Sequence, residues 1–284
     1  MFTPARPAPR PTFIGALPDA TYREPVAHRF AYLDTPTPIA FAHRGGAAEG
    51  DENSMAAFDR AVQAGYRYIE TDVHATSDGV AVVFHDHTLD RMLGRPGTVE
   101  DVTLAELRAA RIGGESVVPT LAELLEAYPE CRLNVDLKAE SVVEPAIETI
   151  RSAQARDRVL LASFSSRRLR RARRICGPRQ ATSLGMAEVA ALRLGSVLGR
   201  GLFGFVPGAA AAQVPIQFNG LKIVTDRFVR YVHRLGLQVH VWTVDDPAQM
   251  RELLDLGVDG IMTDHIEVLR DVLMQRGQWA PQSA

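Results

Sequence analysis

The chain alternates short apolar runs with segments of helical periodicity over most of its length. The apolar runs predict strands at residues 39–42, 68–73, 80–84, 133–137, 159–162, 181–184, 214–218, 238–242 and 260–262. Amphipathic stretches at residues 54–64, 104–110, 121–128, 142–153, 167–175, 226–235 and 248–256 separate most of them. Repeated alternation of this kind predicts a parallel sheet in an α/β fold.

Nine strands are one more than an eight-stranded barrel contains. Residues 80–84 follow 68–73 after only a Ser77-Asp78-Gly79 turn, so this run is the one expected to pair locally, without a helical crossover. The 284 residues, 46% of them hydrophobic, are enough for one large core, and barrels of about 250 residues form single domains.

Residues 1–38 are rich in proline, which predicts an extended arm before the folded domain. We expect the domain to span residues 39–275 and a short tail to follow at 276–284. The first residues hold no apolar run typical of a secretion signal, and no segment reaches the roughly 18 apolar residues of a membrane span. A cytoplasmic location is therefore expected.

The net charge of −2 gives no basic field of the kind that nucleic-acid binding requires. The two cysteines, Cys131 and Cys176, lack the spacing of a zinc site, so we expect reduced thiols. No nucleic-acid partner is predicted, and the oligomeric state is left open.

Two segments depart from the alternation. Residues 167–174 read RRLRRARR, which predicts either a solvated helix face or a contact with anionic lipid or phosphate. Residues 195–212 are apolar and rich in glycine without a clear period. They predict either a packed excursion between barrel elements or a hydrophobic lip that admits an acyl chain or makes peripheral contact with a membrane.

Residues capable of chemistry gather where the predicted strands end. Glu70 and Asp72 lie two apart on one strand, so their carboxylates share a face. Both sit in an apolar run, where burying an uncompensated carboxylate is costly, and this predicts a bound cation. Because the ligands are oxygens, a hard ion such as Mg²⁺ or Ca²⁺ is favoured over zinc.

Other polar residues complete the predicted pocket. His43 and His85 end two of the runs, and imidazoles suit acid/base catalysis near neutral pH. Arg44 and Lys138 add positive charge for an anionic substrate. Barrel enzymes draw their catalytic groups from the C-terminal ends of several strands, as this pattern would.

Residues 43–91, which contain HRGG, ETD and FHDH, resemble the core signature of the glycerophosphodiester phosphodiesterase family. The later pieces LNVDLK (133–138), ASF (162–164), VWTVD (241–245) and GVDGIMTD (257–264) resemble the family in the same order. The resemblance implies a (β/α)₈ TIM barrel, a phosphoric diester hydrolase and a divalent cation.

Carried over residue by residue, the resemblance implies that His43 and His85 are the catalytic pair. It implies metal ligands at Glu70, Asp72 and Asp136, although family members more often carry Glu at the last position. It further implies phosphate contacts by Arg44 and Lys138, a place near the site for Glu52 and Asn53, and an alcohol-pocket role for Trp242.

The expected reaction cleaves a glycerophosphodiester to sn-glycerol 3-phosphate and an alcohol. A lysophospholipase D, acting on lysophospholipids by the same chemistry, is one alternative. A phospholipase D of the sphingomyelin-cleaving kind is a second, and a barrel that only binds phosphodiesters is a third. Neither the nucleophile, water or the substrate's 2-hydroxyl, nor the assignment of base and acid to the two histidines follows from the sequence.

Overall fold

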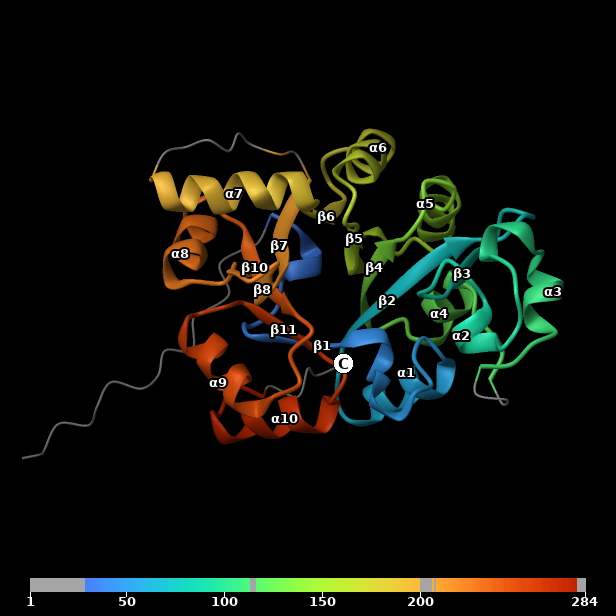
Figure 1. Ribbon diagram of the computed structural model, residues 1–284, viewed down its shortest axis with the longest axis horizontal. Helices are drawn as coiled ribbons and strands as arrows, with labels where there is room; N and C mark the ends of the chain where they lie inside the picture. The colour runs from blue at the N-terminus through green and yellow to red at the C-terminus, as the bar shows by residue number, and fades with distance from the viewer. Residues whose placement is uncertain (1–28, 113–115, 200–205, 207, 280–284) are drawn as a thin grey trace, which may run out of the picture.

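A closed ring of eight parallel strands forms the centre of the chain in the computed structural model, which describes residues 29–112, 116–199, 206 and 208–279 (Figure 1). The ring runs in the order β1, β11, β10, β7, β6, β5, β4, β2, and β1 pairs with β2 to close it. The strands are β1 (Ile39–Ala42), β2 (Tyr68–Ala75), β4 (Arg132–Leu137), β5 (Val159–Ala162), β6 (Ala181–Ser183), β7 (Ala209–Pro215), β10 (Gln238–Trp242) and β11 (Gly260–Thr263). The predicted (β/α)₈ barrel is confirmed.

The ninth strand is accessory, as the short turn predicted. β3 (Ala81–Val83) pairs antiparallel with β2 and stays outside the ring. A two-stranded hairpin, β8 (Gln217–Phe218) and β9 (Leu221–Lys222), follows β7. Its two turn residues, Asn219 and Gly220, have positive φ of 48° and 78°, which matches the preference of Asn-Gly for a tight hairpin turn.

Helices surround the ring, as Figure 1 shows. They are α1 (Met55–Gln63), α2 (Asp90–Leu93), α3 (Leu104–Arg108), α4 (Leu121–Ala127), α5 (Val143–Ser152), α6 (Ser166–Cys176), α7 (Met186–Leu198), α8 (Asp226–Arg234), α9 (Pro247–Asp255) and α10 (Ile266–Gln275). Short 3₁₀ turns lie at η1 (Ala31–Leu33), η2 (His43–Gly45), η3 (Ala47–Glu49), η4 (Val99–Asp101) and η5 (Arg156–Arg158). Within the described chain, no helix combines the length and apolar character needed to cross a membrane.

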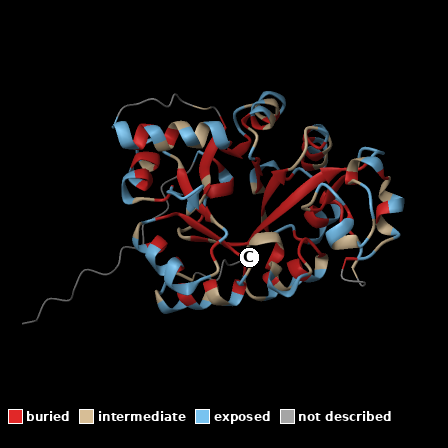
Figure 2. Cartoon of the chain, in the orientation of Figure 1, coloured by how far each residue is buried: buried red, intermediate tan, exposed pale blue. Residues whose placement is uncertain are grey.

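The core has an outer and an inner part, and Figure 2 shows the strands buried along nearly their whole length. Apolar helix faces pack on the outside of the ring. Inside, η1 closes the N-terminal end of the barrel. Its Tyr32 ring packs edge-on against Tyr68, with the centroids 5.3 Å apart, and the Tyr68 hydroxyl donates to the Tyr32 carbonyl at 2.5 Å.

The ends of the chain extend beyond the ring. Residues 1–28 of the predicted arm lie outside the described residues, whereas Phe30, Tyr32 and Leu33 are buried. At the other end, the Trp279 ring packs edge-on against Tyr66, 5.2 Å between centroids, and residues 280–284 again lie outside the described range. The proposed domain boundaries at 38 and 275 thus stay predictions.

The strand predicted at residues 214–218 was placed wrongly, and so was much of the irregular segment at 195–212. Residues 195–198 end α7, residues 209–212 begin β7, and residues 200–205 and 207 lie outside the described range. Four consecutive alanines start β7, and alanine has low intrinsic strand preference. Pairing with β6 and β10 outweighs that preference. The helix α7 itself was missed.

Candidate active site

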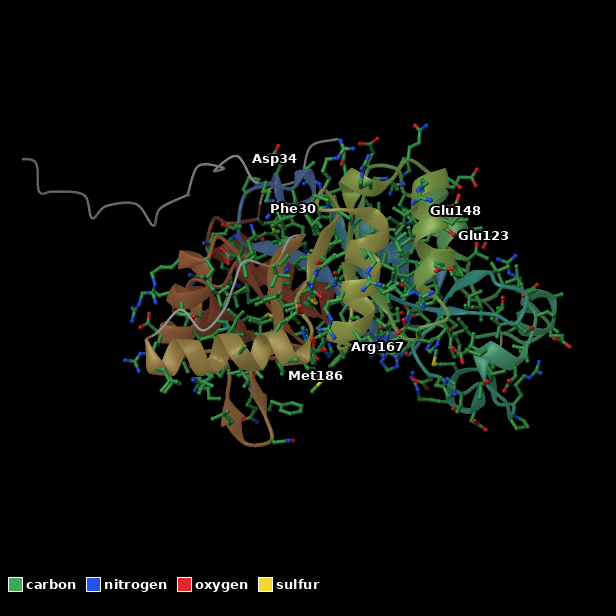
Figure 3. All side chains as sticks on the ribbon, turned by 90° about the horizontal axis from the view of Figure 1, so that it is seen from above. Phe30, Asp34, Glu123, Glu148, Arg167 and Met186 are labelled. Atoms are coloured by element: carbon green, nitrogen blue, oxygen red, sulfur yellow. The ribbon has the colours of Figure 1, made fainter. Side chains whose placement is uncertain are left out.

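The polar residues singled out from the sequence meet at the C-terminal end of the ring. His43 follows β1, Glu70 and Asp72 lie in β2, and His85 follows β3. Lys138 follows β4 directly. Figure 3 shows the barrel from the side. Phe30 lies near its N-terminal end, and the starts of α6 and α7 lie at the opposite end.

Three buried carboxylates form the centre of this cluster. Asp72 and Asp136 are directly paired on neighbouring strands, and Glu70 precedes Asp72 by two residues on the same face. The Lys138 ammonium lies between the paired carboxylates, with Nζ 2.8 Å from Asp72 Oδ1 and 2.9 Å from Asp136 Oδ2. The shared face predicted from the i, i+2 spacing is therefore present.

Opposing electrostatic effects act on these groups. Burial, and next the nearby charge of Asp72, raise the pKa of Glu70. Burial would also raise the pKa of Asp72, but Lys138 and Arg44 outweigh it and lower that pKa. The cluster thus holds one carboxyl that resists ionisation beside one that is fixed in the charged form.

The backbone conformation of Arg44 positions this residue beside the carboxylates. It has a left-handed φ of 51°, and its N–H donates to Glu70 Oε2 at 3.1 Å. Its Nη1 donates to Glu52 Oε1 at 3.0 Å. Its Nε lies 3.2 Å from Asp72 Oδ2, within ion-pair distance although not aligned for a hydrogen bond.

Asn53 fixes the orientation of Asp72. Its Nδ2 donates to Asp72 Oδ2 at 3.0 Å, and its Oδ1 accepts from the Thr71 hydroxyl at 2.7 Å. The Asn53 N–H donates to the Arg44 carbonyl at 2.9 Å, which ties this loop to the turn after β1. Glu52 and Asn53 therefore do lie beside the carboxylate cluster.

His43 is held by a carboxylate that the sequence reading had given no role. Its Nδ1 lies 2.7 Å from Asp264 Oδ1, after β11, and its Nε2 lies 3.8 Å from Glu70 Oε2. Asp264 is held in turn, since its N–H donates to Asp245 Oδ1 at 2.8 Å. Burial lowers the pKa of His43, but Glu70 and Asp264 outweigh it and raise that pKa.

His85 has an equivalent but more exposed support. Its Nδ1 lies 2.6 Å from Asp86 Oδ1, and Arg91 Nε donates to Asp86 Oδ2 at 2.6 Å. Arg91 also reaches Glu52, with Nη2 2.7 Å from Oε1. Arg91 and His85 hydrogen bond Asp86 and hold its pKa far below the usual range.

An aromatic pair stands beside the charged cluster. The rings of Trp242 and Phe164 pack edge-on, 5.3 Å between centroids, and Lys138 Nζ lies 5.8 Å from the centre of the Phe164 ring. Phe164 was quoted only as part of the ASF motif, but its exposed ring widens the apolar surface next to Trp242.

The donor chemistry of the cluster fits a hard divalent cation. Asp136 Oδ1 is buried without a hydrogen-bond partner among the described residues, and the carboxyl of Glu70 resists ionisation in the absence of more positive charge. No three acidic, His or Cys side chains of the described chain are already arranged as a metal-binding group. In this structure Lys138 supplies the charge between Asp72 and Asp136.

Asp264, Asp86 and Arg91 are the supporting residues that sequence reasoning left without roles. Asp86 had a usable signal, because it directly follows His85. Asp264 lies 221 residues from His43, and only closure of β1 against β11 brings the two together.

Comparison with known proteins identifies the family of the chain. The model of the glycerophosphoryl diester phosphodiesterase family matches residues 43–268. "Probable glycerophosphodiester phosphodiesterase 2" of Mycobacterium tuberculosis is 43% identical over 244 residues, which cover 85% of this chain and 92% of the relative. Lysophospholipase D GDPD1 of Rattus norvegicus is 27% identical over 272 residues, covering 82% of this chain and 85% of that protein.

A solved structure, the glycerophosphodiester phosphodiesterase of Agrobacterium tumefaciens, superposes with a TM-score of 0.67 at 25% identity. The match covers 81% of this chain and 98% of that one. The family match extends from His43, directly after β1, to the start of the last helix, and so includes every barrel strand after β1. This chain therefore belongs to the glycerophosphoryl diester phosphodiesterase family.

Proposed function

We propose that the chain hydrolyses glycerophosphodiesters to sn-glycerol 3-phosphate and an alcohol, with His43 and His85 as the general acid/base pair. The observation that carries this proposal is the matched support of the two imidazoles. Each has Nδ1 within 2.7 Å of a carboxylate, Asp264 for His43 and Asp86 for His85. Family membership supports the substrate class.

The matched contacts suit proton transfer. A carboxylate can only accept, so the proton of each neutral imidazole is held on Nδ1 and the lone pair of Nε2 is left free. One Nε2 would remove the proton of the nucleophile, which is water or the substrate's 2-hydroxyl. The other, protonated, would supply the proton that the leaving alkoxide needs.

The charge of the phosphodiester would be held by Arg44 and Lys138. Both lie at the mouth of the barrel, where Arg44 pairs with Glu52 and Lys138 pairs with Asp72. A divalent cation, Mg²⁺ or Ca²⁺, would be held by Glu70, Asp72 and Asp136, and it would supply electrostatic stabilisation of the phosphoryl oxygens. Trp242 would line the pocket for the alcohol.

Turnover of glycerophosphocholine, measured as released glycerol 3-phosphate with Mg²⁺, with Ca²⁺ and with EDTA, tests the proposal. We expect activity with at least one ion and a loss of at least about 100-fold on chelation, restored by the ion. Full activity in excess EDTA would remove the cation from the proposal. If no glycerol 3-phosphate is released with Mg²⁺, with Ca²⁺ or with EDTA, the proposed hydrolysis is wrong.

A lysophospholipase D activity is the second candidate, and one observation favours it. The exposed Phe164 ring enlarges the apolar surface beside Trp242, where an acyl chain could lie. Comparing glycerophosphocholine with lysophosphatidylcholine separates the two substrates. A higher kcat/KM for the lysolipid would favour the second candidate, and equal rates would show that the acyl chain is not recognised.

A further inference from the structure

The helix α7 is apolar on its exposed face as well as on the face that packs against the core. Its exposed positions are all apolar, namely Met186, Ala187, Ala190, Leu194, Val197 and Leu198. Its two charged side chains are half-buried and already have partners: Glu188 pairs with Arg173 at 2.8 Å, and Arg193 donates to the Lys222 carbonyl at 3.3 Å. A surface helix normally shows the opposite arrangement, so this face is built to meet something other than water.

The neighbouring helix α6 carries a basic face on the same side of the molecule. Its exposed residues include Arg167, Arg170 and Arg174. Arg167 pairs with Glu140 at 3.3 Å, whereas no ion pair joins Arg170 or Arg174 to any residue in the described ranges. α6 and α7 lie along one edge of the molecule in Figure 1, and Figure 3 views that edge from above.

The β8–β9 hairpin adds two more exposed apolar side chains. Phe218 and Leu221 are 49% and 54% exposed, on either side of the turn. The contact of Arg193 with the Lys222 carbonyl ties the hairpin to α7, so the two elements are joined. In Figure 3 the hairpin projects beyond α7, on the side where Met186 lies.

The surface is continuous with the mouth of the barrel. The Met186 N–H donates to the Phe164 carbonyl at 2.9 Å, and the Phe164 ring packs on Trp242 beside the candidate active site. The start of α7 is thus joined to the aromatic pair beside the candidate active site. Only this step rests on the proposed function; the surface itself does not.

We propose that the exposed faces of α6 and α7, with the tip of the β8–β9 hairpin, dock the protein on an anionic phospholipid bilayer. The charge pattern argues for this partner, because arginines without ion-pair partners lie beside an apolar face, as on helices that lie in a membrane interface. The aliphatic side chains enter the headgroup boundary and the arginines meet lipid phosphates. Of the membrane contact predicted at residues 195–212, this surface keeps Val197 and Leu198 at the end of α7, whereas Ala209–Ala212 are buried in β7 and residues 200–205 and 207 lie outside the described range.

Vesicle co-sedimentation of the full chain tests the proposal, with phosphatidylcholine vesicles prepared with and without phosphatidylglycerol. We expect binding to the anionic vesicles that weakens at high salt, because the arginine contacts are screened. Arg170→Gln/Arg174→Gln should weaken binding about 25-fold, since each cation near an anionic surface contributes about fivefold. Leu194→Gln/Leu198→Gln should weaken it at least about tenfold.

Matched controls change the same residue types elsewhere. Leu235→Gln/Met274→Gln removes exposed apolar side chains from α8 and α10, and Arg95→Gln/Arg111→Gln removes arginines near α2 and α3. Both should bind like the wild type. Turnover of soluble glycerophosphocholine should be unchanged in all four variants, which also shows that they fold and separates this proposal from the catalytic one.

Three results would overturn the docking proposal. The first is absence of wild-type binding to anionic vesicles. The second is equal vesicle binding by Leu194→Gln/Leu198→Gln and its control Leu235→Gln/Met274→Gln. If the α7 variant does not fold, the same comparison is made between Arg170→Gln/Arg174→Gln and Arg95→Gln/Arg111→Gln. The third is a dimer in analytical ultracentrifugation that the α7 change dissociates, without vesicle binding, because the face would then be an interface between two copies.

Discussion

Asn134 and Asp136 lie two residues apart on β4 and both are buried inside the barrel, yet they belong to opposite kinds of polar layer. Asn134 Oδ1 accepts from Gln213 Nε2 at 3.2 Å, and Gln213 Nε2 also lies 3.3 Å from His240 Nδ1. Asp136 belongs to the charged cluster with Asp72 and Lys138. The deep layer is neutral and hydrogen-bonded, and the layer at the mouth is charged.

The two layers differ in the electrostatic cost of burying their polar side chains. In the deep layer His240 Nε2 lies 2.8 Å from Gln238 Oε1, which fixes a neutral tautomer. Gly260 leaves the room for this ring, because a Cβ there would come within 2.7 Å of Phe41 and 3.0 Å of His240. At the mouth, by contrast, carboxylates crowd together, as expected where a substrate or a cation completes the charge balance.

The largest expected effect is on kcat and comes from substitutions in the layer at the mouth of the barrel. His43→Ala or His85→Ala should lower kcat about 1,000-fold, because each removes a proton-transfer group, while the free energy of unfolding changes by less than about 1 kcal/mol. The measurements are glycerophosphocholine turnover and urea unfolding. His87→Ala, at an exposed histidine near His85, is the control, and near wild-type turnover of either test variant would refute the two-histidine mechanism.

The second prediction concerns stability in the deep layer. Burial lowers the pKa of His240 from 6.5 to about 4. Between pH 4 and pH 6.5, His240 is therefore protonated in the unfolded chain and neutral in the folded chain. Folding stability should therefore fall by about 3 kcal/mol as the pH drops from 6.5 to 4. Urea unfolding against pH should lose this contribution in His240→Gln and keep it in His87→Gln; identical profiles for the two variants would contradict the assignment.

A smaller effect is expected at the support of His43. Asp264→Asn should lower kcat by about 10- to 100-fold, because the amide no longer fixes the Nδ1 proton or stabilises the imidazolium. The limb of the pH–rate profile that His43 sets should also move to lower pH, since Asp264 raises the pKa of His43. A merely structural role would lower stability or kcat without moving that limb.

The smallest effect tests the electrostatic cost at the mouth directly. Glu70→Gln should raise the free energy of unfolding by about 1 kcal/mol in EDTA at neutral pH, because burial and Asp72 disfavour its charged form. Glu130→Gln, at an exposed glutamate, should leave stability unchanged. Added Mg²⁺ or Ca²⁺ should stabilise the wild type more than the Glu70 variant. Destabilisation of the variant in EDTA would mean that the charge is compensated without a cation.

The predictions from sequence succeeded and failed for identifiable reasons. The strand predicted at 68–73 from its apolar run is present and extends to Ala75, and the short turn at 77–79 marks β3 as accessory. The start of β7 could not be predicted, since its alanines favour helix or loop when taken alone. The helix α7 was missed because an apolar exposed face removes the period that reveals a surface helix.

The sequence by itself determined the barrel class and the shared face of Glu70 and Asp72, because strand-to-helix alternation and i, i+2 spacing are local properties that survive without tertiary contacts. Only the tertiary structure decided which groups support the histidines. Asp264 reaches His43 through closure of the ring between β1 and β11, a contact between residues 221 apart. It also decided that the arginines of α6 and the apolar face of α7 lie on one surface, because helix packing against the barrel sets the direction of each face.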